Sequence, residues 1–294
     1  MQTRTIVVGV DGSDTSLAAV RWAAREAEQR AAVLRIVHAF DWEWQSARYS
    51  AGGEFLEAAR RHADTVAATA ARHARAAAPA IHVQPHAVIG NPVPRLLDSA
   101  ADAELLVLGN RGRGGFASLL LGSVSQRLAA HAPCPVVVVR GRGDRTDGPV
   151  AVGVDDSPAA DHVLETAFTA AAARGTGLAV IHTYAPPTPL WLASTVPATD
   201  VETPDQDVIE RQQLDNQLAP WREKFPEVRV ETMLSHDSAA AVLVGASHRA
   251  RLVVVGSHGH GALAGAFLGS TGMQLLHHAD CPVLIARPRP AEGV

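Results

Sequence analysis

Two hydrophobic patterns alternate along the chain. Short runs rich in Val, Ile and Leu end at polar residues or glycine and predict buried strands. In the first half these runs cover residues 4–10, 33–40, 81–89, 104–109 and 135–140. Segments that predict helices lie between them, at residues 13–30, 53–78, 94–101 and 121–131. Strands that alternate with helices and are apolar on both faces indicate a parallel sheet covered by helices on both sides.

The second half repeats this order. Its strands are predicted at residues 150–154, 178–184, 228–234, 251–256 and 282–287, and its helices at 157–174, 205–224, 238–248 and 268–279. The stretch VLGNRGRGGFASLLLGSVSQ returns 147 residues later as VVGSHGHGALAGAFLGSTGMQ, and VVGVDGS returns 144 residues later as AVGVDDS. Two constant offsets that differ by three residues indicate a tandem duplication with a small insertion. We therefore predict an α/β protein with domains at 1–141 and 150–294, joined by a polar, glycine-containing linker at 142–149.

Composition narrows the classes of function. The net charge of −4 provides no overall basic surface, so we expect no nucleic-acid partner. Apolar runs stay shorter than the roughly 18 residues of a membrane span, and the N-terminus carries no secretion signal, so we expect a cytoplasmic protein. The two cysteines, each followed by proline at equivalent repeat positions, fit neither a disulfide framework nor a metal cluster.

Glycine-rich stretches follow the predicted fourth strand of each copy. Ligands of open parallel sheets bind beyond the carboxyl ends of the strands where the strand order reverses, so Asp11 and the loop from Gly109 are expected to face one crevice. Gly122 and Ser123 open a helix whose free amides favour an anion, and Ser125 adds a hydroxyl donor. A standard P-loop is excluded because Lys224 is the only lysine, and a dinucleotide fingerprint is excluded because its glycines follow the first strand.

The spacing Gly, two residues, Gly, nine residues, Gly-Ser occurs in both copies, beginning at Gly109 and at Gly256. With VGVDGS or VGVDDS after strand one, VHA or IHT at strand two and CysProVal before strand five, the chain resembles the ATP-binding branch of the universal stress protein family. The resemblance implies two doubly wound five-stranded parallel sheets, each ordered 3-2-1-4-5, of the adenine nucleotide alpha hydrolase-like type. It also implies one ATP per domain, a role as regulator or sensor of stress, and a homodimer formed through edge strands. Alternatives are a weak ATPase and a nucleotide-free interaction scaffold with protein partners.

The same resemblance assigns site residues. In the first domain they are Gly9, Asp11 and Ala39 around the nucleoside, and Gly109, Asn110, Arg111, Gly112, Arg113, Gly114, Gly115, Gly122, Ser123, Val124 and Ser125 around the phosphates. In the second domain they are Gly153, Asp155 and Thr183, and Gly256, Ser257, His258, Gly259, His260, Gly261, Ala262, Gly269, Ser270, Thr271 and Gly272. No catalytic group is predicted, and we expect at most slow ATP hydrolysis.

For several of these residues the sequence allows more than one role. Asp11 and Asp155 contact the sugar or a Mg²⁺ ion, or else cap the following helix. Arg111 and Arg113 reach phosphate or face solvent. His258 and His260, which replace these arginines, make the second site pH-sensitive or are simply exposed. The aromatic residues of the loops after strand two act as lids over the nucleoside, form surfaces for partners, or anchor those loops; they are Trp42, Trp44, Tyr49 and Trp191.

Overall fold

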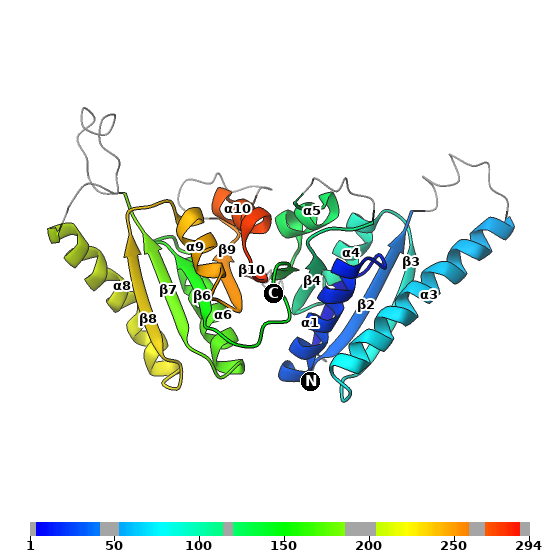
Figure 1. The fold of residues 1–294 in the computed structure, drawn as a ribbon, viewed down its shortest axis with the longest axis horizontal. Helices are drawn as coiled ribbons and strands as arrows, with labels where there is room; N and C mark the ends of the chain where they lie inside the picture. Colours follow the sequence, from blue (N-terminus) through cyan, green and yellow to red (C-terminus); the bar gives the residue numbers. More distant parts are fainter. Residues whose placement is uncertain (1–3, 42–52, 114–119, 186–203, 259–267, 289–294) are drawn as a thin grey trace, which may run out of the picture. The chain divides into compact units, whose positions relative to one another are not determined.

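The computed structural model describes residues 4–41, 53–113, 120–185, 204–258 and 268–288, and the structural statements below concern these residues (Figure 1). The aromatic loop residues named above lie outside them. The chain divides into two compact units. Unit 1 comprises residues 1–144 and 287–294, and unit 2 comprises residues 145–286.

Unit 1 contains one parallel five-stranded sheet. Its strands are β1 (Thr5–Gly9), β2 (Val33–Phe40), β3 (Val83–Ile89), β4 (Leu105–Gly109) and β5 (Val136–Val139). They are ordered β3-β2-β1-β4-β5, and every neighbouring pair is parallel. The predicted order 3-2-1-4-5 is thus confirmed. After β1 the chain adds β2 and β3 on one side of β1, and it then adds β4 and β5 on the other side. The connections that leave β1 and β4 therefore run to opposite sides, which opens a crevice at the carboxyl ends of these two strands.

Four helices of unit 1 cover the sheet. They are α1 (Asp14–Arg30), α3 (Gly53–Ala77), α4 (Pro92–Ala100) and α5 (Ser123–His131). The first two pack together on one face and the last two on the other (Figure 1). Every residue of β1 and of β4 is buried, as the uninterrupted apolar runs predict.

Unit 2 has the same arrangement. Its elements are β6 (Val150–Val154), α6 (Ala160–Ala173), β7 (Leu178–Thr183), α8 (Pro204–Lys224), β8 (Val230–Ser235), α9 (Ala239–Ser247), β9 (Leu252–Gly256), α10 (Ser270–His278) and β10 (Val283–Ala286). The strand order is β10-β9-β6-β7-β8, again parallel throughout. Helices α6 and α8 contact each other, as do α9 and α10. The tandem doubly wound fold is therefore confirmed.

Side chains at the helix starts explain where the elements begin. The Ser13 side chain accepts the Ser16 amide and is the N-cap of α1. Helix α4 starts two residues earlier than predicted, at Pro92, because the Asn91 side chain accepts the Val93 amide and caps it. Ser238 caps α9 at the corresponding place in unit 2. Cys134 and Cys281, which precede the last strand of each unit, are buried and are not joined in a disulfide.

Candidate functional site

A cavity of about 440 Å³ opens in unit 1 beyond the carboxyl ends of β1 and β4. This volume falls in the range of small-molecule sites in proteins. Eleven of the predicted site residues line it; they are Gly9, Asp11, Ala39, Gly109, Arg111, Gly112, Arg113, Gly122, Ser123, Val124 and Ser125. The structure thus brings the residue after strand one, the loop after strand four and the start of α5 to one crevice, although about a hundred residues of sequence separate the first from the others.

Asp11 connects the end of β1 to the glycine-rich loop. Its Oδ1 atom accepts hydrogen bonds from the Ser13 amide at 3.0 Å and the Ser13 hydroxyl at 2.6 Å. Its Oδ2 atom accepts the backbone N–H of Arg113 at 2.6 Å, across 102 residues of sequence. Ser13 rather than Asp11 provides the N-cap of α1, so the role of Asp11 in unit 1 is to hold the loop.

The hydrogen bonds keep Asp11 ionised. Burial raises the pKa of the carboxyl group, but the bonds from the Ser13 hydroxyl, the Ser13 amide and the Arg113 amide outweigh burial and hold the pKa below its usual value. A group with a lowered pKa stabilises the fold above the pKa of the unfolded chain, and this stabilisation is lost as the pH falls through the folded value. The carboxylate therefore keeps the loop in place at neutral pH.

The loop is fixed at two further points. The Thr15 hydroxyl donates to the carbonyl oxygen of Arg111 at 2.5 Å, and the Asn110 carbonyl accepts the Gly122 amide at 2.8 Å. At Gly112 a Cβ atom would lie 2.5 Å from the Asp11 Oδ2 atom, so only glycine allows the loop to approach the carboxylate this closely. Because residues 110–113 of the loop are held in this way, they present their backbone and arginine side chains to a ligand with little ordering cost at binding.

The start of α5 supplies the anion-favouring end of the cavity. Gly122 is its N-cap and makes no side-chain capping bond, while Ser123 is exposed at the first helical position. Ser125 differs from the prediction. Its hydroxyl, expected to donate to a phosphate, donates instead to the carbonyl oxygen of Gly109 at 2.7 Å and so holds α5 against β4.

Apolar side chains form the opposite side of the cavity. A Cβ atom at Gly9 would lie 2.9 Å from Leu108 and 3.1 Å from Leu96, so these leucines pack directly against the strand end. Sequence reasoning missed the lining residues Val10, Ser16, Pro92, Leu96, Leu108 and Leu121. The position of α4 after strand three was the available signal, because in a doubly wound sheet that helix covers the end of β1. Asn110 does not line the cavity, and Gly114 and Gly115 lie outside the described residues.

Unit 2 repeats part of this geometry. The Asp155 carboxylate accepts the Ser157 amide at 3.1 Å and its hydroxyl at 2.5 Å. The Gly269 amide donates to the Ser257 carbonyl at 3.0 Å, which matches the bond between Gly122 and Asn110. Gly153 packs against Leu243, the equivalent of Leu96.

The other predicted residues of unit 2 follow the repeat. Thr183 ends β7, Gly256 ends β9, and Ser270, Thr271 and Gly272 form the first turn of α10. The His258 ring nitrogen Nδ1 lies 3.0 Å from the Ser257 hydroxyl. Gly259, His260, Gly261 and Ala262 lie outside the described part of the chain.

One residue distinguishes the two loops. Thr15, which holds the Arg111 carbonyl in unit 1, corresponds to Ala159 in unit 2 through the offset of 144 residues. Alanine carries no hydroxyl, so this hydrogen bond is restricted to unit 1. The glycine-rich loop of unit 2 therefore lacks the hydrogen bond that Thr15 makes to its counterpart in unit 1.

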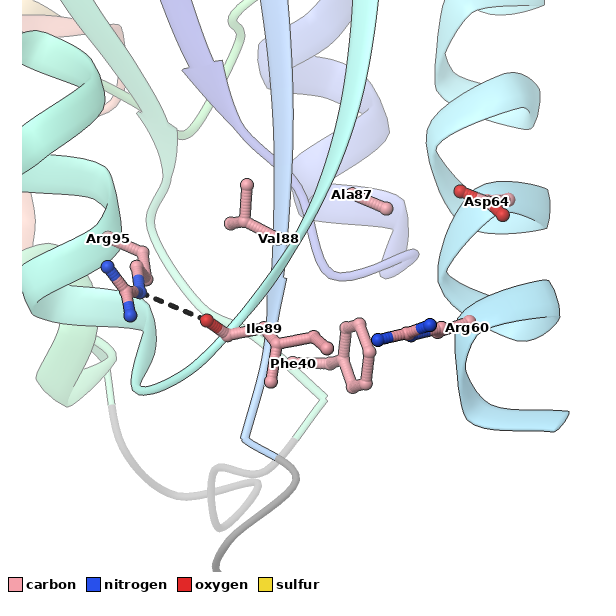
Figure 2. Close-up of a pocket in the computed structure, with 7 residues that line it drawn as sticks. All are labelled: Phe40, Arg60, Asp64, Ala87, Val88, Ile89 and Arg95. Atoms are coloured by element: carbon pink, nitrogen blue, oxygen red, sulfur yellow. Dashed lines mark hydrogen bonds between the residues drawn. The ribbon is translucent and has the colours of Figure 1, made fainter. Parts of the chain in front are cut away.

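A second hollow of about 510 Å³ lies at the β3 edge of unit 1 (Figure 2). It lies between α3, which carries Arg60 and Asp64, and the start of α4, which carries Arg95. The Arg95 Nε donates to the Ile89 carbonyl at 3.0 Å, and its guanidinium pairs with Asp98 at 3.6 Å. No predicted site residue lines this hollow and it contains no glycine-rich loop, so its larger volume does not make it the candidate nucleotide site.

His38 is bonded to Val10, one of the residues that line the cavity of unit 1. This histidine makes the stability of unit 1 depend on pH. Its Nδ1–H donates to the Val10 carbonyl at 2.7 Å. Burial lowers its pKa from the usual value near 6.5 and outweighs the opposing effect of this hydrogen bond. The unfolded chain therefore takes up the proton more readily than the folded chain, and stability present above pH 6.5 is lost as the pH falls below it.

We expect the wild-type chain to lose more unfolding free energy between pH 7.5 and pH 5.5 than a His38→Gln variant, in which the titrating ring is absent. Chemical denaturation at the two pH values measures this difference. Equal losses in the two proteins would show that His38 does not carry the pH dependence.

No described helix combines the length and the apolar character that crossing a membrane requires. The described residues thus define a tandem α/β protein whose first unit has a cavity at the point where the strand order reverses. Comparison with known proteins identifies the family. The model of the universal stress protein family matches residues 2–140 and 148–287.

Individual proteins agree with this match. A universal stress protein of Mycobacterium tuberculosis is 37% identical over 295 residues, which cover 96% of each chain. The crystal structure of a universal stress protein from Archaeoglobus fulgidus has a TM-score of 0.71 at 18% identity and covers 98% of this chain and 99% of that one. A universal stress protein whose crystal structure is in complex with cAMP is 32% identical, covers 47% of this chain and 97% of that chain, and has a TM-score of 0.37. The chain belongs to the universal stress protein family and carries two tandem copies of its domain.

Proposed function

We propose that this protein is an ATP-binding regulator with one nucleotide site in each unit. The observation that carries the proposal is the cavity of unit 1, which combines a fixed glycine-rich loop, two arginines and the N-terminus of α5 with an apolar wall. These are the features that a nucleoside phosphate needs, because its base is apolar on both faces and its phosphates are anionic.

Each part of the nucleotide has a matching part of the cavity. The base and sugar fit between Gly9, Ala39 and the side chains of Leu96 and Leu108. The phosphates fit against the backbone of residues 111–113 and the first turn of α5, where free amides and the helix dipole favour negative charge. Asp11 also lines the cavity and would be the residue to contact a sugar hydroxyl or a Mg²⁺ ion that accompanies the phosphates.

The geometry favours retention of ATP over rapid hydrolysis. Among the described residues that line the cavity, Asp11 is the only carboxylate, and both of its oxygens already accept hydrogen bonds. Its lowered pKa also makes it a weak base. We therefore infer that the nucleotide acts as a signal that the protein holds, and that a weak ATPase activity is the second candidate function.

The proposal is tested by the nucleotide that the purified full-length chain carries. We expect chromatography of the denatured protein to release ATP, with up to two molecules per chain, and added ATP to raise the melting temperature of nucleotide-free protein. One ATP per chain would assign binding to unit 1, whose loop has the Thr15 hydrogen bond. Absence of both bound nucleotide and a thermal shift would contradict the proposal and favour the scaffold function.

Continuous phosphate release distinguishes the second candidate. A regulator should release little phosphate over many protein equivalents of ATP. Multiple turnovers that disappear in the Asp11→Ala, Asp155→Ala double variant would assign ATPase activity to these sites instead.

A further inference from the structure

Three side chains of unit 2 converge at a point that sequence reasoning did not single out. Asp156 follows β6, His182 lies in β7 and Glu210 lies in α8. One nitrogen or oxygen atom from each lies within 4.8 Å of those from the other two. The group draws together three segments that are far apart in sequence, which a surface cluster of acidic residues on one helix would not do.

The backbone fixes the protonation of His182 at one ring nitrogen. Its Nδ1 atom lies 3.2 Å from the Val154 carbonyl oxygen, and a carbonyl can only accept, so Nδ1 carries the hydrogen. In the neutral ring Nε2 therefore carries a lone pair. This arrangement, in which one nitrogen donates to a backbone carbonyl and the other is available, is how protein metal sites orient their histidine ligands.

Glu210 is oriented in the same manner. Its side chain is only 12% exposed and that of His182 only 6%. The side-chain Nε2 of Gln206 donates to the Glu210 Oε1 atom at 2.8 Å, which leaves Oε2 directed at the His182 Nε2 atom, 3.4 Å away. The nearly buried pair thus places two electron-pair donors face to face, with an outer hydrogen bond supporting each.

The 3.4 Å between the His182 Nε2 atom and the Glu210 Oε2 atom matches the spacing of two ligand atoms on one metal ion better than a direct hydrogen bond. A direct charge-assisted hydrogen bond from a protonated ring would be about 2.7–2.9 Å long. Two ligand atoms bound about 2.1 Å from a tetrahedral zinc ion lie about 3.4 Å apart. We propose that Asp156, His182 and Glu210 bind a Zn²⁺ ion.

The ligand types favour zinc over the commoner hard cations. One imidazole nitrogen with two carboxylate oxygens suits Zn²⁺, whereas Mg²⁺ and Ca²⁺ prefer oxygen alone. Asp156 is exposed, so rotation of its side chain completes the set and its side of the site is the access route for the ion. A fourth position is left for water.

Unit 1 provides an internal comparison. His38 in β2 makes the same bond, from Nδ1 to the carbonyl of Val10 at the end of the neighbouring strand β1, yet the residue equivalent to Asp156 is Gly12. Gly12 has a φ of +81° and its Cβ position faces Val66 on α3. The second copy thus has a carboxylate where the first has glycine, beside a histidine that both copies contain. Because this site uses Asp156 rather than Asp155, it does not depend on the proposed nucleotide site.

Zinc titration of the full-length, nucleotide-free chain tests the proposal. After treatment with EDTA and its removal, a chromogenic chelator should report one tightly held Zn²⁺ per wild-type chain. Glu210→Gln and Asp156→Asn should each weaken binding at least tenfold, and Gln206→Leu should weaken it about tenfold because it removes an outer-shell bond. Co²⁺ bound in place of zinc should show the absorption of a tetrahedral site with nitrogen and oxygen ligands.

Matched variants separate this result from general effects. Glu223→Gln changes an exposed carboxylate on the same helix, and His38→Gln changes the equivalent histidine of unit 1; both should bind zinc as the wild type does. Asp156 is exposed, so Asp156→Asn remains informative even if Glu210→Gln fails to fold. Absence of stoichiometric zinc, or the same affinity in Asp156→Asn and wild type, overturns the proposal. Because the measurement contains no nucleotide, failure to bind ATP would leave its outcome unchanged.

Discussion

Replacing Gly109 by alanine should destabilise unit 1 by about 2–3 kcal/mol, in the upper range for an overpacked site. The added Cβ atom would lie 2.8 Å from the carbonyl carbon and oxygen of Thr15 and 3.1 Å from the Ser16 amide nitrogen. These are backbone atoms of the first turn of α1, so no side-chain rotation relieves the contact. To make room, α1 must move away from β4, and this movement also pulls on the Arg111 carbonyl that Thr15 holds.

The repeat supplies the control, because Gly256 occupies the equivalent position in unit 2. A Cβ atom there would meet the His258 carbonyl oxygen at 3.0 Å and a Val163 methyl group at 3.3 Å. These contacts are looser and one of them involves a side chain. Urea denaturation should therefore show a smaller loss of unfolding free energy for Gly256→Ala than for Gly109→Ala. Equal losses would mean that the close approach of α1 to β4 has no energetic weight.

The Asp11→Ala variant should lose nucleotide binding in unit 1 by about 10- to 100-fold. Removing the carboxylate takes away the acceptor for the Ser13 and Arg113 amides, and hydrogen bonds to charged groups contribute about 1.5–3 kcal/mol each. The loop then orders only when nucleotide binds, so the ordering cost reduces the affinity. Calorimetric titration of nucleotide-free protein with ATP measures the change.

Two further variants make the result specific. Asp11→Asn keeps an oxygen acceptor of the same shape but no charge, and should fall between wild type and Asp11→Ala. Asp155→Ala removes the equivalent carboxylate from unit 2 and should leave unit 1 binding intact. If Asp11→Ala binds ATP with wild-type affinity and stoichiometry, then Asp11 does not organise the site.

The glycine spacing identified the framework of the site because backbone geometry imposes it. At Gly109 and at Gly112 a Cβ atom would lie within 2.8 Å of another atom. Such close contacts allow only glycine, so they can be recognised in the sequence as glycines at the same positions of both copies. The strand order followed from the family resemblance, and the crevice followed from the strand order. Helix bounds differ from the predicted ones by up to three residues, and at α4 the Asn91 cap explains the earlier start.

The hydrogen-bond partners of individual side chains could not be predicted from the glycine spacing or the strand order. The Ser125 hydroxyl turns to Gly109 because α5 packs closely on β4, which the position of a serine in the sequence does not reveal. The group of Asp156, His182 and Glu210 depends on how α8 lies against β6 and β7. Glu210 also lies in the segment of the second copy where the offset between the copies changes from 144 to 147 residues. The inserted residues prevent a direct alignment of this segment with the first copy.

Under the proposed function, the difference between Thr15 and Ala159 has a consequence for signalling. Two identical nucleotide sites would fill at the same nucleotide concentration. In this chain the Thr15 hydrogen bond restrains only the first loop, so the two sites should fill at different nucleotide concentrations. Its first unit would remain filled while the nucleotide pool declines, and its second would empty early. Such a molecule would pass through three occupancy states, with both units, only the first unit or neither unit filled, and its output would follow the energy supply of the cell in steps.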